Sequence, residues 1–164
     1  MRGVDCHGCG GGQADALSVV CHVHGDNVVM NISEPDPQAA KQTPFERIGG
    51  EQSVRALVDR FYDLMDLEPG FKELRALHPA TLDGSRDKLF WFLCGWLGGP
   101  DYYAERFGHP RLRARHMPYA IAISERDQWL ACMAQAMMEL NWDASLAQRL
   151  LEAFFGTADW MRNQ

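Results

Sequence analysis

The sequence lacks a run of apolar residues long enough to span a membrane. It also lacks a continuous apolar stretch before Cys21, which a secretory signal peptide would require. A basic excess is missing too, since the net charge is −6 and the pI is about 5.4. These absences argue against a membrane protein and against a nucleic-acid binder, and they predict a cytoplasmic protein.

Cysteine is present in an odd number, five, and without a secretory signal, which argues against a framework of disulfides. Cys94 and Cys132 occur within helical patterns, so we interpret them as small buried apolar side chains. The other three cysteines lie within residues 1–42, which form a candidate extension that is rich in glycine at its start and in proline at its end. Its two β-rich runs could pair as a small hairpin, and a flexible extension is the alternative.

Residues 43–164 show no strand pattern, and their apolar periodicity predicts an all-α domain. Thr43, Pro44 and Glu46 have the spacing of a capping box with proline at the first helical position, which predicts a short first helix. The further helices that we expect are 51–66, a short turn at 71–77, 83–97, one beginning near 124 and a last one beginning at 143. Residues 101–123 have an irregular period and predict short helical pieces at most.

Two features of the domain suggest a bound cofactor. The segment 108–119 carries three arginines, two histidines and two prolines between well-formed helical patterns, and guanidinium groups suit a carboxylate partner. Tyr62 and Trp129 lie on apolar helix faces, where a buried phenol and a buried indole each need a hydrogen-bond partner. The alternative is that the arginines are a solvated charge run and that the two aromatics are ordinary core residues.

A series of motifs in a fixed order carries a resemblance to a known family. The motifs are Phe45-Glu46-Arg47-Ile48-Gly49-Gly50, Arg60-Phe61-Tyr62, Trp96-Leu97-Gly98-Gly99-Pro100, Gly108-His109-Pro110-Arg111-Leu112-Arg113-Ala114-Arg115-His116 and Glu125-Arg126-Asp127-Gln128-Trp129-Leu130. In this order and spacing, the segment from Pro44 to Gln164 resembles the group II truncated haemoglobins of bacterial type. The resemblance implies a two-over-two helical sandwich around haem b, with a reduced helix before the proximal histidine.

The resemblance also implies roles for single residues on the proximal side of the haem. His116 matches the proximal iron ligand, and its second ring nitrogen should be hydrogen-bonded so that the ring is held in place. Arg115 is then a plausible partner for a haem propionate, with Tyr103 and His109 as weaker candidates.

On the distal side, Tyr62 and Trp129 match the family's hydrogen-bond donors to the bound ligand. His78 stands where the family often has tyrosine or phenylalanine, and its preferred role is a hydrogen bond to the ligand or to a water. The alternatives are that it binds the iron as a sixth ligand, or that it only bonds Tyr62 or solvent. Ser85 falls at the entry to the pocket. Apolar wall is expected from Leu89 and Phe92.

The family implies binding of dioxygen, carbon monoxide and nitric oxide, as needed for oxygen storage, transport or sensing. The alternatives are a peroxidase, or a nitric oxide dioxygenase that would need an external reductase because the chain has no flavin or nicotinamide domain. A helical interaction domain without haem is a third hypothesis. The oligomeric state is left open between a monomer and a homodimer.

A separate hypothesis concerns zinc in the N-terminal extension. The residues with ligand chemistry at compatible spacing are Cys6, Cys9, Cys21 and His24, with His22 as an alternative fourth ligand. Cys6-His7-Gly8-Cys9 is not a covalent haem-attachment motif, because Gly10 stands where that motif needs histidine. An extension without a metal is the preferred interpretation.

Overall fold

The computed structural model describes residues 42–164, and within them the chain is helical with no strand. The elements in chain order are α1 (Pro44–Ile48), α2 (Glu51–Leu67), the 3₁₀ turn η2 (Pro69–Phe71), α3 (Lys72–Ala76), α4 (Asp83–Trp96), α5 (Tyr102–Phe107), α6 (Leu112–His116), α7 (Ile123–Glu139) and α8 (Ala144–Met161). The all-α prediction is confirmed, and the long helices begin and end close to the predicted residues. No helix in the described range is both long and apolar enough to cross a membrane. The predicted hairpin and the candidate zinc ligands lie outside the described residues.

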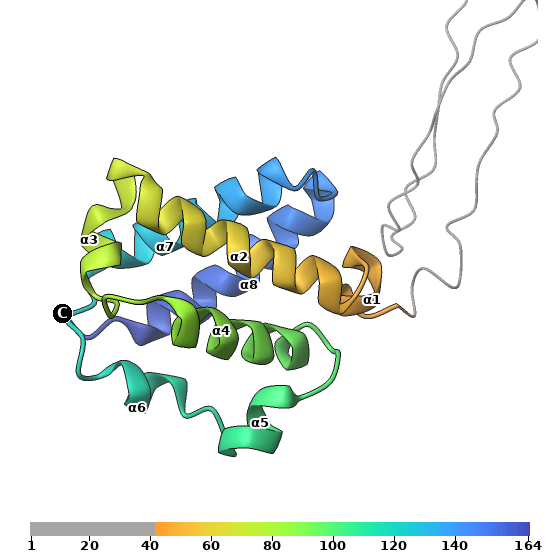
Figure 1. Ribbon diagram of the computed structural model, residues 1–164, viewed down its shortest axis with the longest axis horizontal. Coiled ribbons are helices and arrows are strands. Elements are labelled where there is room, and N and C mark those ends of the chain that lie inside the picture. Colours follow the sequence, from red (N-terminus) through yellow and green to blue (C-terminus); the bar gives the residue numbers. More distant parts are fainter. Residues whose placement is uncertain (1–41) are drawn as a thin grey trace, which may run out of the picture. The chain divides into compact units, whose positions relative to one another are not determined.

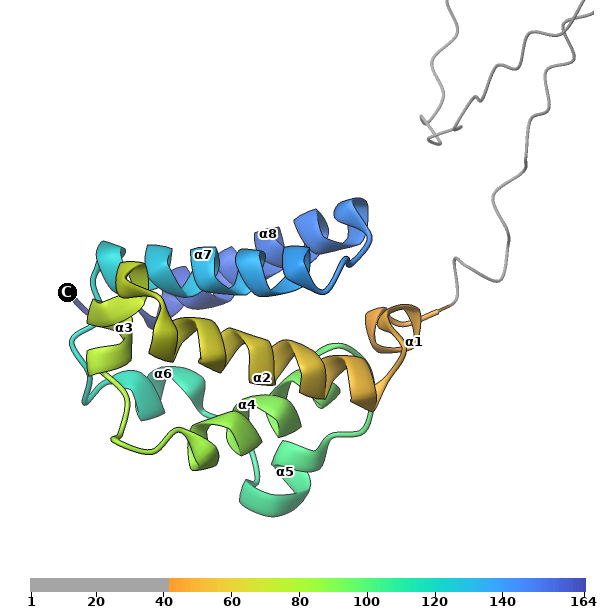
Figure 2. The same ribbon diagram turned by 45° about the horizontal axis from the view of Figure 1, so that its top comes forward.

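Four long helices form two antiparallel pairs, and this is the two-over-two arrangement (Figures 1 and 2). Helix α2 packs against α4 in one pair, and α7 packs against α8 in the other. Helix α2 also packs against α7, so it joins the two pairs. Because α2 contacts both α4 and α7, its surface must be apolar over a wide arc. Its buried residues are Val54, Leu57, Val58, Phe61, Tyr62, Leu64 and Met65.

The first helix is attached to the body by its start and by its aromatic side chain. The predicted capping box is present, because the Thr43 hydroxyl accepts from the Glu46 N–H at 3.2 Å and the Glu46 carboxylate accepts from the Thr43 N–H at 2.8 Å. The Phe45 N–H donates to the carbonyl of Leu97 at 3.0 Å. A Cβ atom on Gly99 would lie 2.6 Å from the Phe45 ring, so glycine is what lets α1 approach the end of α4.

Residues 101–123, for which the sequence predicts short helical pieces at most, contain the two short helices α5 and α6. Helix α5 packs against α4, and α6 packs against α8. Helix α6 follows Arg111, whose φ of 45° places it in the left-handed region, which is uncommon outside glycine. A sharp change of direction therefore precedes the helix that ends in His116.

Candidate functional site

His116 is the last residue of α6 and is half-buried. Its Nδ1 atom lies 2.7 Å from the carbonyl oxygen of Leu112, one helical turn earlier. A carbonyl can only accept, so Nδ1 carries the proton, and in the neutral ring Nε2 has a free lone pair. This is the tautomer that a metal-binding imidazole needs, and the expected hydrogen bond to the second ring nitrogen is present.

His78 follows α3 and repeats the same local arrangement. Its Nδ1 atom donates to the carbonyl of Leu74 at 2.9 Å, which leaves Nε2 as the unprotonated nitrogen of the neutral ring. Burial lowers the pKa of His78 and outweighs the hydrogen bond to Leu74, which raises it, while the charge of Arg75 lowers it further.

Tyr62 is a buried phenol on α2 that meets both α4 and the segment after α3. Its ring lies 5.8 Å from the His78 ring, edge to face, and 5.0 Å from the Phe61 ring. Burial raises the pKa of Tyr62, while a hydrogen bond with the Ser85 side chain and the charge of Arg86 act in the opposite direction. Burial has the larger effect, so the phenol stays protonated and its hydroxyl can donate.

Trp129 lies on α7, half-buried, with its ring centroid 5.5 Å from that of Phe61 and 5.5 Å from that of Phe154. Its indole N–H donates to no other residue of the described range. Tyr62 and Trp129 thus contact the same Phe61 side chain from two different helices. Because Tyr62 follows Phe61 directly on α2, the contact between Trp129 and Phe61 places α7 beside this part of α2.

Three of the residues expected at the pocket wall and at the haem propionates lie together, namely Phe92, Tyr103 and Arg115. Phe92 on α4 contacts the buried ring of Tyr103 edge to face at 6.3 Å, and the Arg115 guanidinium lies 5.9 Å from that ring. Arg115 is exposed and also donates from Nε to the carbonyl of Pro110 at 2.9 Å. Leu89 is half-buried and packs against the core of the domain.

His109 is exposed, and its Nδ1 accepts from the backbone N–H of Arg111 at 3.1 Å. A hollow of about 470 Å³ is lined in part by His109, Phe92 and Leu112. It therefore reaches Leu112, whose carbonyl accepts the hydrogen bond from the His116 ring. The residues that line the hollow are Phe92, Trp96, His109, Pro110, Arg111, Leu112, Gly156, Thr157 and Trp160.

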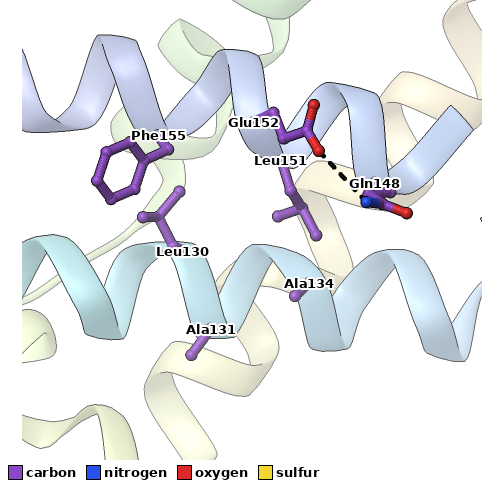
Figure 3. Close-up of a pocket in the computed structure, with 7 residues that line it drawn as sticks. All are labelled: Leu130, Ala131, Ala134, Gln148, Leu151, Glu152 and Phe155. Carbon is purple, nitrogen blue, oxygen red and sulfur yellow. Dashed lines mark hydrogen bonds between the residues drawn. The ribbon is translucent and has the colours of Figure 1, made fainter.

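A second hollow, of about 520 Å³, lies between α7 and α8 and is separate from the histidines (Figure 3). Its lining is mostly apolar, and none of the expected site residues belongs to it. The lining residues are Leu130, Ala131, Ala134, Gln148, Leu151, Glu152 and Phe155.

Comparison with known proteins agrees with this geometry. The sequence model of the bacterial-like globin family matches residues 43–163. A group 2 truncated hemoglobin of Bacillus subtilis is 38% identical over 121 residues, which cover 74% of this chain and 89% of the relative. The chain belongs to the group II truncated haemoglobins.

Solved structures of the family are similar to this chain in their three-dimensional fold as well. A group II 2-on-2 hemoglobin of Agrobacterium tumefaciens is 46% identical, with a TM-score of 0.73 over 75% of this chain and 95% of the relative. A truncated oxygen-avid haemoglobin of Bacillus subtilis is 37% identical, with a TM-score of 0.69 over 74% of this chain and all of the relative (100%). The two-over-two globin fold is therefore shown for this truncated haemoglobin.

Membership in the globins implies a haem group, and the donor set of this globin fits one. The Nε2 atom of His116 has the lone pair that iron requires, and the rings of His78 and Tyr62 lie together, with their centroids 5.8 Å apart. Arg115 makes no ion pair with any described carboxylate, so its guanidinium can take a propionate. No cluster of three or more His, Cys, Asp and Glu residues suits a directly bound metal ion within residues 42–164.

Two residues of the site in this globin were missed by the sequence analysis. Arg86 lies 5.6 Å over the Tyr62 ring, and Asn163 donates to the carbonyl of His116 at 3.3 Å. Neither residue belongs to a recognisable motif, and each contacts a segment that is distant in the sequence. The Leu112 carbonyl, in contrast, could have been found, because it lies four residues before His116 on the same predicted helical piece.

Proposed function

We propose that the chain holds haem b through Nε2 of His116 and reversibly binds dioxygen and other diatomic gases on the opposite side, beside Tyr62, Trp129 and His78. The iron supplies the position at which the gas binds. The observation that carries the proposal is the 2.7 Å hydrogen bond from Nδ1 of His116 to Leu112, which fixes the ring and leaves Nε2 available. The description of a Bacillus subtilis relative as oxygen-avid supports dioxygen as the ligand.

The donors of the pocket act on the charge of the bound ligand. The haem iron would supply a site at which a bound gas takes on partial negative charge, and hydrogen bonds to charged acceptors are about twice as strong as neutral ones. Tyr62 keeps its proton because burial raises its pKa, so it donates over the whole physiological pH range. Trp129 adds an indole N–H from α7.

His78 differs from these donors in its protonation. Its Nδ1 proton is committed to Leu74, and its lowered pKa keeps the ring neutral near pH 7. The free Nε2 atom is then an acceptor, which suits a water, the Tyr62 hydroxyl or the iron itself. We infer that His78 competes with external ligands more readily than it donates to bound dioxygen.

The arginine and tyrosine beside α4 hold the other end of the cofactor in this proposal. Arg115 and Tyr103 lie together, and an exposed guanidinium next to a buried phenol is suited to one propionate. His109, which is exposed and lies at the hollow near Leu112, is the second candidate. Ser85, Leu89 and Phe92 form the entry and wall on α4.

The experiment that tests the proposal is the visible absorption spectrum of the purified protein. We expect a Soret band that shifts on reduction and again with dioxygen and carbon monoxide. His116→Ala should lose or alter this band, whereas His22→Ala, outside the matched globin region, should leave it unchanged. Absence of a Soret band from the wild type after addition of haemin would overturn the proposal.

The ferric spectrum tests the role of His78. We expect a mixture of a water-bound form and a low-spin form with two histidine ligands. His78→Ala should remove the low-spin form and leave the water-bound form. A low-spin fraction that is unchanged in the variant would show that His78 is not an iron ligand.

A further inference from the structure

The short helix α6, which ends in His116, is not stable without contacts from other parts of the chain. Helix α6 has five residues, and no side chain caps its start. Nucleation makes so short a helix unstable in isolation, because few backbone hydrogen bonds offset the ordering of the chain. The direction of the His116 ring must therefore be set by contacts from outside α6.

Asn163, which follows α8, supplies such contacts with its whole side-chain amide. Nδ2 donates to the carbonyls of His116 at 3.3 Å and Tyr119 at 2.8 Å, and Oδ1 accepts from the backbone N–H of Ile121 at 3.0 Å. The backbone N–H of Asn163 donates to the carbonyl of Ile121 at 3.0 Å. Both donors and the acceptor of the amide are thus used on the segment 116–121.

A second contact joins α6 to the same part of the chain. The Arg113 guanidinium donates to the carbonyl of Trp160 and, at 3.2 Å, to that of Arg162. These are carbonyls at the end of α8, where a helix leaves acceptors without partners in its own backbone. Arg113 and Asn163 therefore both bind α6 and the segment after it to the end of α8.

The end of α8 is itself attached to α7. The Asp159 carboxylate accepts from Arg126 of α7 and, at 2.7 Å, from Arg162. Helix α7 carries Trp129, one of the proposed distal donors. A continuous set of polar contacts therefore connects the segment of His116 to the helix of Trp129.

We propose that Asn163 is a positioning residue, which holds the carbonyl of His116 and so sets the direction of the imidazole toward the haem pocket. The part of this inference that concerns haem rests on the proposed function. The part that concerns the order of residues 113–121 does not, and it can be measured without haem.

The first test is limited trypsin digestion of the haem-free protein, wild type against Asn163→Ala. Cleavage after Arg115 requires α6 to open, and the loss of three side-chain hydrogen bonds should make it about tenfold faster. Cleavage after Arg60, in the middle of α2, is the internal reference and should be unchanged. Gln164→Ala is the matched control, because Gln164 contacts Ile121 through its backbone alone.

A second variant separates the amide's donors from its size. Asn163→Asp keeps an oxygen for the Ile121 N–H but replaces the two donated bonds by a carboxylate oxygen facing the carbonyls of His116 and Tyr119. Cleavage after Arg115 should be at least as fast as in Asn163→Ala. If Asn163→Asp or Asn163→Ala is cut there at the wild-type rate relative to Arg60, the inference is overturned.

The second readout is the iron–histidine stretching band of the reduced haem complex. Asn163→Ala should broaden or shift this band and Gln164→Ala should not, because only the first frees the carbonyl of His116. An unchanged band in Asn163→Ala would refute the positioning role toward haem. A wild type without any such band would instead refute the proposed function, and the trypsin result would still decide whether Asn163 orders α6.

Discussion

At the scale of the residue, the two histidines of the site are oriented by the same local contact. In both His78 and His116, Nδ1 donates to the carbonyl four residues earlier, so the backbone fixes the tautomer of each ring. Their roles in the proposal differ because of their surroundings. His78 contacts the buried ring of Tyr62, whereas His116 lies on a short helix next to the exposed Arg115.

The distal donors can be tested one at a time. Tyr62→Phe and Trp129→Phe should each raise the dissociation rate of dioxygen about tenfold or more, since a hydrogen bond to a charged group contributes about 1.5–3 kcal/mol. Stopped-flow measurement of ligand release gives the rate directly. Tyr119→Phe, which alters an exposed tyrosine, and Trp142→Phe, outside the site, are the controls. Wild-type rates in both site variants would mean that the distal assignments are wrong.

Arg86 adds a charge to this pocket from a position that the sequence analysis did not single out. Its guanidinium donates to the carbonyl of Asp59 at 2.7 Å and to the Asp63 carboxylate at 2.6 Å, and it lies over the Tyr62 ring. It therefore joins α4 to α2 at the point where the phenol is buried. The contact between the two helices thus lies beside the Tyr62 ring.

We expect Arg86→Met to loosen that contact while keeping the length of the side chain. The variant loses a carbonyl partner and a carboxylate partner of a half-buried guanidinium, so its melting temperature should fall. Arg149→Met is the matched control, because Arg149 is exposed on α8 and its guanidinium makes no hydrogen bond or ion pair with another described residue. Equal melting temperatures for the two variants would contradict a role of Arg86 in joining the helices.

At the scale of the element, the local sequence predicts the long helices and their ends well and the short helices only in outline. The periodic apolar face of α2 and the capping box at Thr43 are local patterns, and both are present as predicted. Helix α7 begins at Ile123, one residue before the expected Ser124, with the Glu125 carboxylate accepting from the Ala122 N–H at 2.8 Å. The short helices α5 and α6 have no periodicity of their own, because tertiary contacts and not an amphipathic face stabilise them.

The contact between α1 and α4 gives a prediction at this scale. Gly99→Ala would place a methyl group 2.6 Å from the Phe45 ring, so the ring must move and the stability should fall by about 1–3 kcal/mol. Gly84→Ala, on α4 with no atom within 4 Å of the added Cβ, should leave stability unchanged or raise it by at most about 1 kcal/mol. Urea unfolding of the two variants provides the comparison. Equal effects would show that Phe45 does not depend on the glycine.

At the scale of the whole molecule, two cysteines are enclosed in the core as predicted. Cys94 and Cys132 are both fully buried, and the Cys132 thiol donates to the carbonyl of Phe61 at 3.2 Å. Burial raises the pKa of Cys94 to about 11 and that of Cys132 to about 12. The folded chain therefore keeps both thiols protonated at a pH where the unfolded chain would lose the protons.

This difference predicts that the protein becomes less stable in alkaline solution. Because the folded pKa values exceed the ordinary thiol value of 9.0, the stability is complete below pH 9 and falls as the pH rises toward 11 and 12. Each thiol contributes at most about 1.4 kcal/mol per pH unit. In urea unfolding from pH 8 to 11, the double variant Cys94→Ala/Cys132→Ala should lose stability with a shallower slope. A slope equal to that of the wild type would contradict the prediction.

The sequence by itself determined the helical class, the apolar face of α2 and the motifs from Phe45 to Leu130 that carry the family resemblance. These features depend on the spacing of neighbouring side chains, which a helix translates directly into faces and ends. Only the tertiary structure decided that Arg86 lies over Tyr62 and that Asn163 binds the carbonyl of His116. Such contacts join residues far apart in the chain, and they follow from how the helices pack, which no local pattern records.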